Sequence, residues 1–431
     1  MIASGLARVR NMQSSYFAFR AESHFLYLVG RQLEGALLLL HEGVATLFVS
    51  LPEAQDELWM GPEPSVQQLT ELCGLEVKSI ADFVAPDTEL AVLAPQDTDT
   101  ADWLAAYVDR PLEAGGDPQT EADLKLADAM IEVRLVHDTA ALDQMTQAAH
   151  VAELAHAAGL RALKPGLREA AVQAAMEAEI VAHGMIPAYP SIVTVHGEVL
   201  HNERHDGVAQ AGDLLLADVG AETPEGWASD VTRTWPVTGT FSGSQRTIYE
   251  LVLGAQQAAI ASVAPQVRYR DVHRVAAKKL LEGLVALGIF RGNVEELYAL
   301  GAAGVFFPHG VGHLLGLDVH DLDDLGDRAT YASGRQRSQQ MGERYLRLDR
   351  DLQANMVVTI EPGFYQVPSI LNGELPPGVN DALNRSELAK YADVRGIRIE
   401  DDVRVTNDGH EVLTQAIVKS VSEVESAARG V

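Results

Sequence analysis

The chain has 431 residues, of which 33 are basic and 61 are acidic, and its formal net charge is −28. This length is too great for one ordinary hydrophobic core and predicts two domains, while 47% apolar and 22% charged residues exclude a disordered chain. The excess of acid argues against nucleic acid and anionic membranes as partners, because both carry negative charge.

The amino-terminal segment carries Arg8 and Arg10, but no apolar stretch follows them, so no signal peptide is expected. No apolar run approaches the roughly 18 residues that a membrane-spanning helix needs. Cys73 is the only cysteine, which excludes an internal disulfide and a zinc site made of thiolates. We therefore expect a cytoplasmic protein.

The first third of the chain is predicted to be an α/β unit, because short apolar runs alternate with turn residues and helix-like segments. The densest run, residues 36–40, is interpreted as a buried strand. Residues 111–120 contain Gly115-Gly116-Asp117-Pro118 and are typical of a linker. The predicted elements are strands at residues 25–30, 35–40, 45–50 and 90–94 and helices at residues 65–74 and 99–108.

The remaining chain is predicted to contain one arrangement twice, a pair of helices followed by strands, which indicates two similar α+β halves. Asp138 can cap the first helix, and Lys164-Pro165-Gly166 ends it. Residues 321–351 are polar and irregular, and a loop of that length in a compact domain is usually functional or mobile. The predicted elements are helices at residues 138–163, 167–183, 244–263 and 271–287, with strands within residues 186–237 and after residue 287.

Metal-type ligands stand at the ends of apolar runs in this second part. Taken singly, Asp-x-Gly and Glu-Pro-Gly after a strand are ordinary turn chemistry, although Gly310 and Gly312 make a helix unfavourable around the nearby histidines. Taken together, four carboxylates and one histidine would offset the charge of two divalent cations, which could share a water and convert it to a hydroxide nucleophile at neutral pH. The four carboxylates are Asp218, Asp230, Glu361 and Glu400, and the histidines near these runs that could supply the fifth ligand are His309, His313 and His320.

This set resembles the pita-bread metallopeptidases, a family that includes methionine aminopeptidase, aminopeptidase P and Xaa-Pro dipeptidase (prolidase). Residues 19–25 (FRAESHF) and 59–61 (WMG) are similar to the N-terminal domain of aminopeptidase P and long-form prolidase. The resemblance implies an α/β N-terminal domain of the creatinase/aminopeptidase P type at residues 1–123, which would dimerise and form the rim of the active site. An α+β pita-bread catalytic domain would follow at residues 124–431.

By this resemblance, the metal ligands are Asp218, Asp230, His313, Glu361 and Glu400. Asp230 and Glu400 would bridge both ions, Asp218 would hold one, and His313 and Glu361 would hold the other. Manganese is the expected metal, and the mixed oxygen and nitrogen ligands leave cobalt and zinc as alternatives.

The resemblance also implies catalytic roles for four residues. Glu361 would accept a proton from the bridging water. His309 and His320 would stabilise the developing oxyanion and move a proton to the leaving group. Arg398 lies two residues before Glu400, on the same face of a regular strand, and would donate a hydrogen bond to a ligand carboxylate.

Three further positions match substrate-binding residues of the family. His201 matches a histidine that lies on the side of the substrate carboxyl group. Tyr189 matches a tyrosine that precedes this histidine, and in the family the loop between the two is somewhat longer. The hairpin from Asp218 to Asp230 is slightly longer than in aminopeptidase P, which its tip can absorb. Trp59 resembles a tryptophan that reaches the neighbouring subunit's site in prolidase-like dimers; the alternative is an ordinary half-buried aromatic residue.

A dipeptidase must also recognise the free carboxylate of proline, and an arginine in the site would provide a directional, two-pronged contact. Residues 345–352 (YLRLDRDL) resemble the prolidase segment that carries such an arginine, which would be Arg347. Residues 370–391 also resemble a prolidase insertion. The other arginines of the loop, which are interpreted as solvated surface, are Arg328, Arg335, Arg337 and Arg344.

The sequence therefore favours an Xaa-Pro dipeptidase that hydrolyses Xaa-Pro dipeptides by a hydroxide bridging two divalent metal ions. The first alternative is an aminopeptidase P, which releases the N-terminal residue from Xaa-Pro-Yaa peptides. Two further alternatives are a non-catalytic pita-bread binding protein and a creatinase-like hydrolase that uses the fold without metal. The expected partners are a small peptide with proline at its second position and a second copy of the chain, in a homodimer.

Overall fold

The computed structural model describes residues 1–52 and 56–430 and divides into two compact units, Met1–Leu135 and Val136–Val431. Helix α5 (Glu121–Arg134) belongs to the first unit, so the division falls at its end rather than after residue 123. Contacts of α5 explain this: Arg110 donates to both oxygens of Asp123, at 2.7 and 2.8 Å, and the Tyr27 hydroxyl donates to the carbonyl of Val133.

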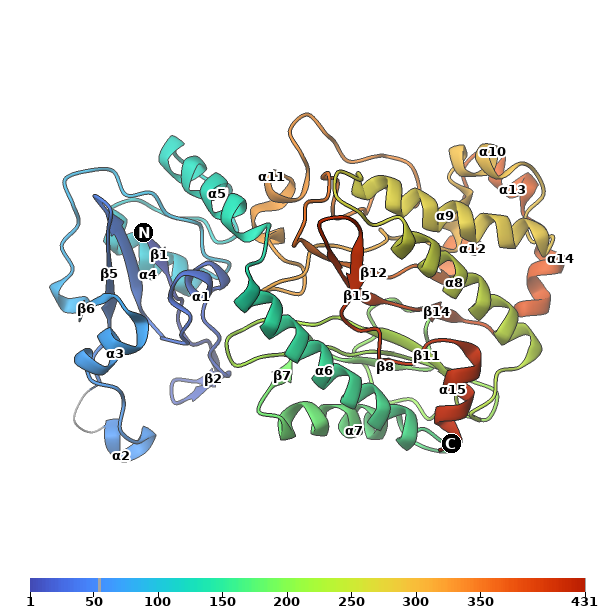
Figure 1. Ribbon diagram of the computed structural model, residues 1–431, viewed down its shortest axis with the longest axis horizontal. Coiled ribbons are helices and arrows are strands. Elements are labelled where there is room, and N and C mark those ends of the chain that lie inside the picture. The colour runs from blue at the N-terminus through green and yellow to red at the C-terminus, as the bar shows by residue number, and fades with distance from the viewer. Residues whose placement is uncertain (53–55, 431) are drawn as a thin grey trace. The chain divides into compact units, whose positions relative to one another are not determined.

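The first unit is built on a four-stranded sheet in the order β1-β4-β5-β6 (Figure 1). Strands β1, β4 and β5 are antiparallel neighbours, and β5 and β6 run parallel. Buried side chains of the strands pack with Leu104 of α4 into the core of the unit. The elements are β1 (Ile2–Ala3), β2 (Val9–Met12), β3 (Ser15–Tyr16), α1 (Ser23–Val29), β4 (Leu37–His41), β5 (Val44–Val49), α2 (Asp56–Met60), α3 (Val66–Cys73), β6 (Glu76–Ser79), η1 (Ile80–Asp82) and α4 (Thr98–Val108).

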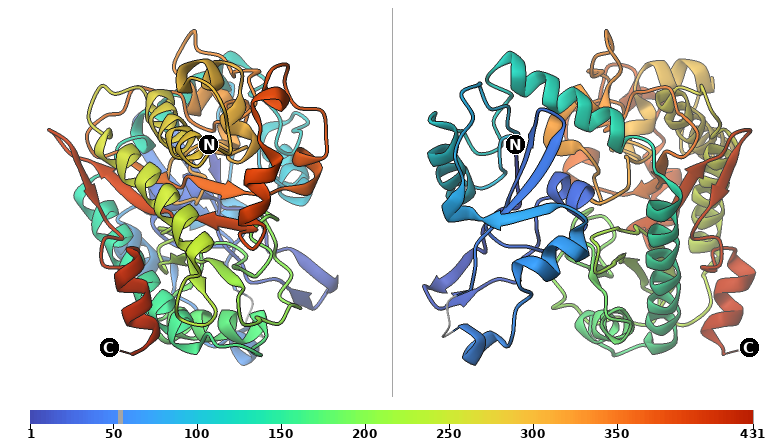
Figure 2. Two further views of the ribbon diagram at one scale, coloured as in Figure 1. Left: turned by 90° about the vertical axis from the view of Figure 1, so that its right-hand side faces the viewer. Right: turned by 60° about the vertical axis from the view of Figure 1, so that its left-hand side comes forward.

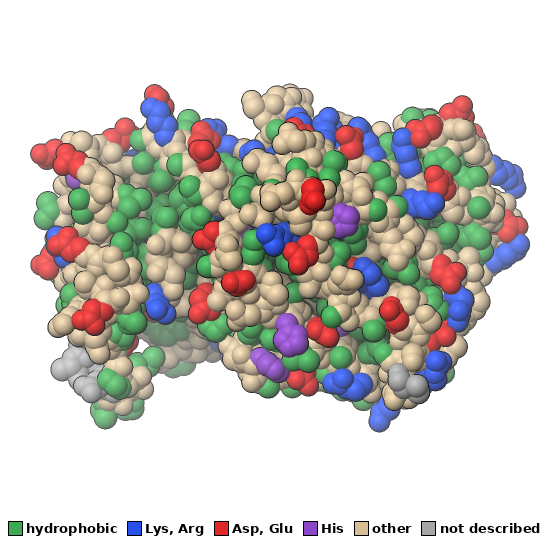
Figure 3. Space-filling view, in the orientation of Figure 1, with side chains coloured by type: hydrophobic (Ala, Val, Ile, Leu, Met, Phe, Trp, Pro, Cys, Tyr) green, Lys and Arg blue, Asp and Glu red, His purple; other side chains and the backbone are tan. Residues whose placement is uncertain are grey.

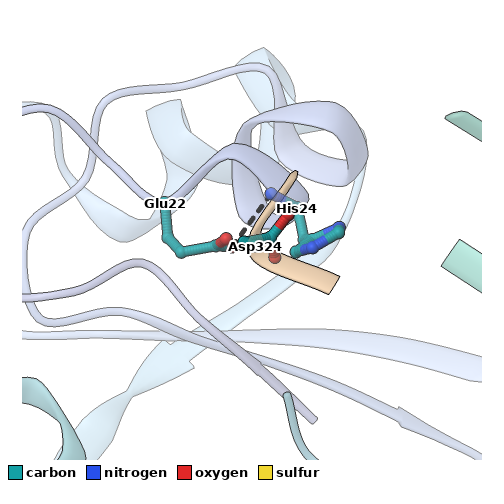
Figure 4. A group of neighbouring side chains, drawn as sticks. All are labelled: Glu22, His24 and Asp324. Atoms are coloured by element: carbon teal, nitrogen blue, oxygen red, sulfur yellow. Dashed lines mark hydrogen bonds between the residues drawn. The ribbon is translucent and has the colours of Figure 1, made fainter. Parts of the chain in front are cut away.

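Two strand predictions in this unit are wrong. Residues 25–30 belong to helix α1 and its C-cap. The Glu22 carboxylate is the N-cap and accepts the N–H of His24 (Figure 4) and that of Phe25. Gly30 ends the helix in the left-handed conformation, with φ 68°. Residues 90–94 join no sheet, since the Met1 amino group donates to Ala91 and Asp123 accepts from Val92. The predicted strand at 36–40 forms, but its end is solvated: Leu40 is 51% exposed.

The second unit contains the two predicted helix pairs. Helix α6 (Thr139–Ala162) begins at its N-cap Asp138 and packs beside α7 (Glu169–Ala182). Helix α8 (Gly243–Ala261) packs beside α9 (Tyr269–Ala286), and the C-terminal α15 (Val421–Ala428) lies against α6 and α8 (Figure 2). The long apolar faces of these helices are buried, and the core of the unit lies between them and the sheets.

The strands of the second unit form small antiparallel sheets, β11-β9-β8, β12-β15-β16, β10-β7 and β13-β14. Strand β14 also lies beside β11, because the Thr234 hydroxyl bonds to the Arg398 backbone and the N–H of Glu400 donates to Thr232. The two halves therefore meet where their strands carry acidic residues. The strands are β7 (Ile186–Pro187), β8 (Ile192–Thr194), β9 (Leu214–Asp218), β10 (Ala221–Glu222), β11 (Thr232–Pro236), β12 (Val357–Ile360), β13 (Gly363–Tyr365), β14 (Gly396–Arg398), β15 (Asp401–Val405) and β16 (His410–Val412).

The segment at 321–351 is irregular, as predicted, with only short helical turns. On the face drawn in Figure 3, acidic and basic side chains are interspersed. Within the described residues, no helix is long and apolar enough to cross a membrane. The remaining short helices are α10 (Val294–Ala299), η2 (Ala302–Val305), η3 (Asp323–Leu325), α11 (Gly326–Thr330), α12 (Pro368–Leu371), α13 (Val379–Ala382), α14 (Arg385–Leu388) and η4 (Ala389–Tyr391).

Candidate metal centre and active site

A pocket of about 340 Å³ in the second unit gathers most of the residues that the sequence singled out. Its lining includes all of the predicted site residues except Tyr189 and Trp59. The residues that line it are Leu200, His201, Asp218, Asp230, His309, Gly310, Gly312, His313, His320, Arg337, Tyr345, Arg347, Glu361, Arg398 and Glu400.

The acidic residues enter the pocket from strand ends. In the antiparallel pair of β9 and β11, Asp218 lies opposite Thr232, two residues beyond Asp230. The hydroxyl of Tyr189 lies 2.6 Å from a carboxylate oxygen of each aspartate, so the two acids are close neighbours. Glu361 and Glu400 stand in the short breaks between β12 and β13 and between β14 and β15.

His313 completes this group from an extended segment beside β12. Ligand atoms of Asp230, His313 and Glu400 all lie within 4.8 Å of one another, and all three side chains are buried. The His313 Nδ1 donates to the carbonyl of Leu314 at 2.9 Å, which directs Nε2 toward Asp230 (3.3 Å) and Glu361 (3.7 Å). Imidazole Nε2 and surrounding carboxylate oxygens form a donor set that suits a divalent cation.

Gly312 makes the approach of this segment to β12 feasible. Its φ is 153°, and a Cβ atom there would collide with the carbonyl oxygen of Thr359. The segment is held by the N–H of His313, which donates to the Thr359 hydroxyl, and by the N–H of Glu361, which donates to Val311. A side chain at position 312 would therefore displace two of the metal-type residues.

The electrostatics of the pocket favour a cation. Burial raises the pKa of Glu361 to about 7 and that of Glu400 well above its ordinary value, and repulsion from Asp230 and Asp218 adds to both shifts. Burial also raises the pKa of Asp218, against the effect of Arg398. Crowded, buried carboxylates are costly without compensating charge, so the residues present fit divalent metal ions.

Arg398 connects three parts of the site from a buried position. Its guanidinium donates to Asp218 at 2.5 Å, to the Thr232 hydroxyl at 2.9 Å and to the Tyr365 hydroxyl at 3.3 Å. Thr232 in turn donates to Glu400 at 2.7 Å. The arginine thus orients one metal-type carboxylate directly and another through a threonine.

The pocket histidines other than His313 favour the neutral state. Burial, followed by the positive charge of Arg398, lowers the pKa of His309 to about 3 and also lowers that of His201. Burial, followed by His313, lowers the pKa of His320 to about 2; the two rings meet edge to face, with centroids 4.3 Å apart. The His309 Nδ1 donates to Gly310, and its Nε2 accepts from the Tyr365 hydroxyl at 2.9 Å.

Tyr189 and Trp59 differ from the other predicted site residues. The Tyr189 hydroxyl contacts Asp218 and Asp230 and lies against the ligand carboxylates rather than in the pocket lining. Trp59 belongs to α2 in the first unit, and its side chain is 79% exposed, so it is not the half-buried aromatic of the alternative interpretation.

Sequence reasoning missed three residues that support the predicted metal-type residues. Tyr365 bonds to His309 and Arg398, Thr232 bonds to Glu400, and the Asp402 carboxylate accepts the N–H of Asp230 at 3.2 Å. Strand alternation gave a signal for all three, because positions two and four residues from a metal-type residue share its face. For Asp402, two residues after Glu400, this signal was obscured by the run of acidic residues in which it stands.

Comparison with known proteins agrees with this geometry. The family description "Metallopeptidase family M24" matches residues 143–407, and "Aminopeptidase P, N-terminal domain" matches residues 1–94. A probable Xaa-Pro aminopeptidase of Fusarium vanettenii is 34% identical over 427 residues, covering 96% of this chain and 87% of the relative. The human Xaa-Pro dipeptidase is 31% identical over 428 residues, covering 96% and 85%.

Solved structures show the same relationship. Aminopeptidase P from E. coli with the inhibitor Pro-Leu superimposes with a TM-score of 0.81 at 28% identity, covering 100% of this chain and 95% of that one. An aminopeptidase PepP of Pseudomonas aeruginosa gives a TM-score of 0.80 at 30% identity, covering 99% and 92%. The predicted fold is confirmed, and the chain belongs to metallopeptidase family M24, with an aminopeptidase P-type N-terminal domain and a pita-bread domain.

Proposed function

We propose that the protein is an Xaa-Pro dipeptidase, which hydrolyses the bond before proline in a dipeptide. The observation that carries this proposal is Arg347, whose side chain lines the same pocket as the metal-type carboxylates. A guanidinium there can recognise a carboxylate placed directly after the scissile bond.

The metal site of the proposal holds two divalent cations, with manganese proposed and cobalt and zinc as alternatives. Asp230 and Glu400 would contribute to holding both ions, Asp218 would hold one, and His313 and Glu361 would hold the other. When bound, the cations activate a water molecule and polarise the scissile carbonyl.

The residues around this site have different roles in the reaction. Glu361 accepts a proton from the attacking water. His309 and His320, which are neutral and at the pocket wall, pass on to the proline nitrogen the proton that Glu361 has taken from the water, and stabilise negative charge on the carbonyl oxygen. His201 lies on the side of the substrate carboxyl group, and Arg398 and Tyr189 hold the ligand carboxylates in place.

Besides Arg398, two arginines of the 321–351 loop line the pocket, Arg347 and Arg337, and their contacts distinguish them. The Arg337 guanidinium is engaged on all sides, by Asp327 through Nε and a terminal nitrogen, and by the Leu346 carbonyl at 3.0 Å. Arg347 has one ion pair within the described residues, from a terminal nitrogen to Asp323 at 2.5 Å. A free edge of Nε and the second terminal nitrogen remains for an incoming carboxylate, which makes Arg347 the clamp.

A free carboxylate follows proline directly only in a dipeptide. In an Xaa-Pro-Yaa peptide, that position holds a neutral amide, which offers a guanidinium no ion pair. One observation favours the alternative function, aminopeptidase P: the solved structures with TM-scores near 0.8 are aminopeptidases P.

We also propose a homodimeric, cytoplasmic enzyme. Three consecutive apolar side chains of the first unit, Leu58, Trp59 and Met60, are each more than three-quarters exposed and offer a surface for a second copy. The single, half-buried Cys73 is compatible with a reducing compartment.

Replacing Arg347 with alanine tests the clamp. We expect kcat/KM for Ala-Pro to fall by roughly 100-fold or more, since a charge-assisted bidentate contact is lost, while kcat/KM for a tripeptide changes little. Arg344→Ala, which removes another arginine of the same loop from outside the pocket lining, should leave both rates near those of the wild type. An equal effect of Arg347→Ala on both substrates would contradict the proposal.

A further inference from the structure

Arg347 is held by an acidic residue of its own loop, Asp323, and this contact has a consequence for specificity. We propose that Asp323 is a specificity-determining residue, which pairs with one edge of the Arg347 guanidinium and weakens the attraction of Arg347 for the substrate carboxylate. The inference rests on the proposed function, because it assigns the strength of the same clamp.

The position of Asp323 is fixed relative to the active site. It begins the short helix η3, and its N–H donates to the carbonyl of His320 at 3.2 Å. The preceding residue, Leu322, has a left-handed backbone with φ 64°, a conformation that leucine adopts at a cost, and its side chain is fully buried. A buried, conformationally restricted turn therefore presents Asp323 to the clamp.

The contact between Asp323 and Arg347 joins a single pair of atoms. One Asp323 oxygen meets one terminal nitrogen of Arg347, at 2.5 Å. Arg335, in the same loop, instead has a terminal nitrogen at 2.7 and 2.8 Å from both oxygens of Asp351. Arg347 lines the pocket and Asp323 does not, so the aspartate holds the guanidinium from the side away from the substrate. This contact orients Arg347 and leaves its other edge available.

The charge of Asp323 opposes the substrate. Together with Arg347 it forms a pair with no net charge, so an incoming carboxylate meets a guanidinium that is already neutralised and a second negative group beyond it. The other pocket-lining arginines are also paired, Arg337 with Asp327 and Arg398 with Asp218. Within the described lining of the pocket, no other arginine compensates for this loss.

The pair is weak enough for its removal to be informative. The side chains of Arg347 and Asp323 are 41% and 28% exposed, and ion pairs with such exposure contribute about 0–1 kcal/mol to stability. Replacing Asp323 should therefore change substrate affinity without unfolding the protein. Asparagine keeps an oxygen that can accept from Arg347 and removes only the charge.

The test compares Asp323→Asn with the wild type on Ala-Pro and on Ala-Pro-amide, which lacks the carboxylate. We expect KM for Ala-Pro to fall by roughly 3- to 10-fold with kcat unchanged, and KM for the amide to stay the same. Asp351→Asn is the matched control, because it removes one negative charge from the same loop but its partner Arg335 lies outside the pocket lining. It should leave both KM values unchanged.

The outcomes separate this inference from the proposed function. An unchanged or higher KM for Ala-Pro in Asp323→Asn would overturn the inference, provided that Arg347→Ala still loses the preference for Ala-Pro over its amide. If Arg347→Ala keeps that preference, the clamp itself fails and the inference fails with it. Asp323→Ala should bind Ala-Pro less well than Asp323→Asn, because it also removes the contact that orients Arg347; equal or tighter binding would contradict the orienting role.

Discussion

At the scale of single residues, the pocket depends on side chains that hold other side chains. Arg398 is fully buried and satisfies Asp218, Thr232 and Tyr365 at once. Supporting residues of this kind fix the orientation of metal ligands before a metal arrives. The sequence indicated Arg398 through its position two residues before Glu400, and Thr232 only through its position two residues after Asp230.

Arg398→Lys tests this support. Lysine keeps the charge but cannot reach three acceptors with a planar fork, so we expect metal affinity and kcat each to fall by roughly 10- to 100-fold. Calorimetric titration of the metal-free protein with Mn²⁺ measures the first, independently of activity. Tyr365→Phe removes only one partner of Arg398 and should weaken Mn²⁺ binding less. Wild-type Mn²⁺ affinity in Arg398→Lys would show that the ligands are oriented without it.

The protonation of a single residue, His273 of helix α9, affects the stability of the whole protein. Burial lowers its pKa to about 4, and its ring packs against Phe307. Because an unfolded histidine has a pKa of about 6.5, the unfolded state binds a proton below that pH and the native state does not. The stabilising effect is complete above pH 6.5 and is lost as the pH falls toward 4.

We therefore expect the free energy of unfolding to fall on acidification through this range, by up to about 1.4 kcal/mol per pH unit from this residue. His273→Phe should reduce the slope by as much as one proton. Urea denaturation at pH 7, 6 and 5 measures both proteins. Identical slopes would exclude His273 as a source of the acid sensitivity.

At the scale of elements, capping and turn residues determined which predictions were correct. The helices of the second unit were predicted because Asp138, Pro165 and Gly166 mark their ends. The apolar run at residues 25–30 was misassigned, because a run that short has no periodicity that separates strand from helix. Its N-cap, Glu22, is also an unusual capping residue. Residues 90–94 were misassigned because their backbone partners, Met1 and Asp123, are distant in sequence.

A buried ionic network joins elements next to the metal-type residues. Arg233 of β11 donates to the carbonyls of Thr232 and Glu400 and to the carboxylate of Asp401. Asp401 also accepts from Lys419 near the C-terminus. Arg233 and Asp401 are both fully buried, so each charge depends on the other.

Asp401→Asn should destabilise the protein by about 3–5 kcal/mol, because it leaves Arg233 buried without its carboxylate. Arg404→Ala, also in β15, removes a partly exposed ion pair with Glu411 and should cost at most about 1 kcal/mol. Guanidinium denaturation measures both. A loss below 1 kcal/mol in Asp401→Asn would mean that the network does not anchor these strands.

At the scale of the whole molecule, the two units and the family follow from the sequence, whereas the substrate does not. The pattern of metal-type residues near strand ends was sufficient to predict the family. Once the sheets form, the spacing of these residues along the chain fixes where they meet; they are Asp218, Asp230, His313, Glu361 and Glu400. In the function that we propose, the choice between dipeptide and longer peptide rests on a loop arginine that has a free edge. That property arises from the contacts of an irregular loop, which carry no sequence period.

The net charge of −28 bears on how a dipeptide is distinguished from a longer peptide. An acidic protein does not attract an anionic substrate through its overall field, so recognition of a carboxylate must be local. We propose Arg347 as this local group; it lines the pocket and contacts Asp323. The metal-type carboxylates account for only four of the 61 acidic residues.

The most direct test of the central claim is a side-by-side assay of Ala-Pro and Ala-Pro-Ala, with the protein first treated with chelator and then reconstituted with Mn²⁺. We predict that the chelated protein cleaves neither, and that the reconstituted protein cleaves Ala-Pro with a kcat/KM at least roughly 10-fold above that for Ala-Pro-Ala, a difference of about 1.4 kcal/mol. Rapid cleavage of the tripeptide with none of the dipeptide would contradict the dipeptidase and identify an aminopeptidase P. Full activity without metal would contradict the metal centre.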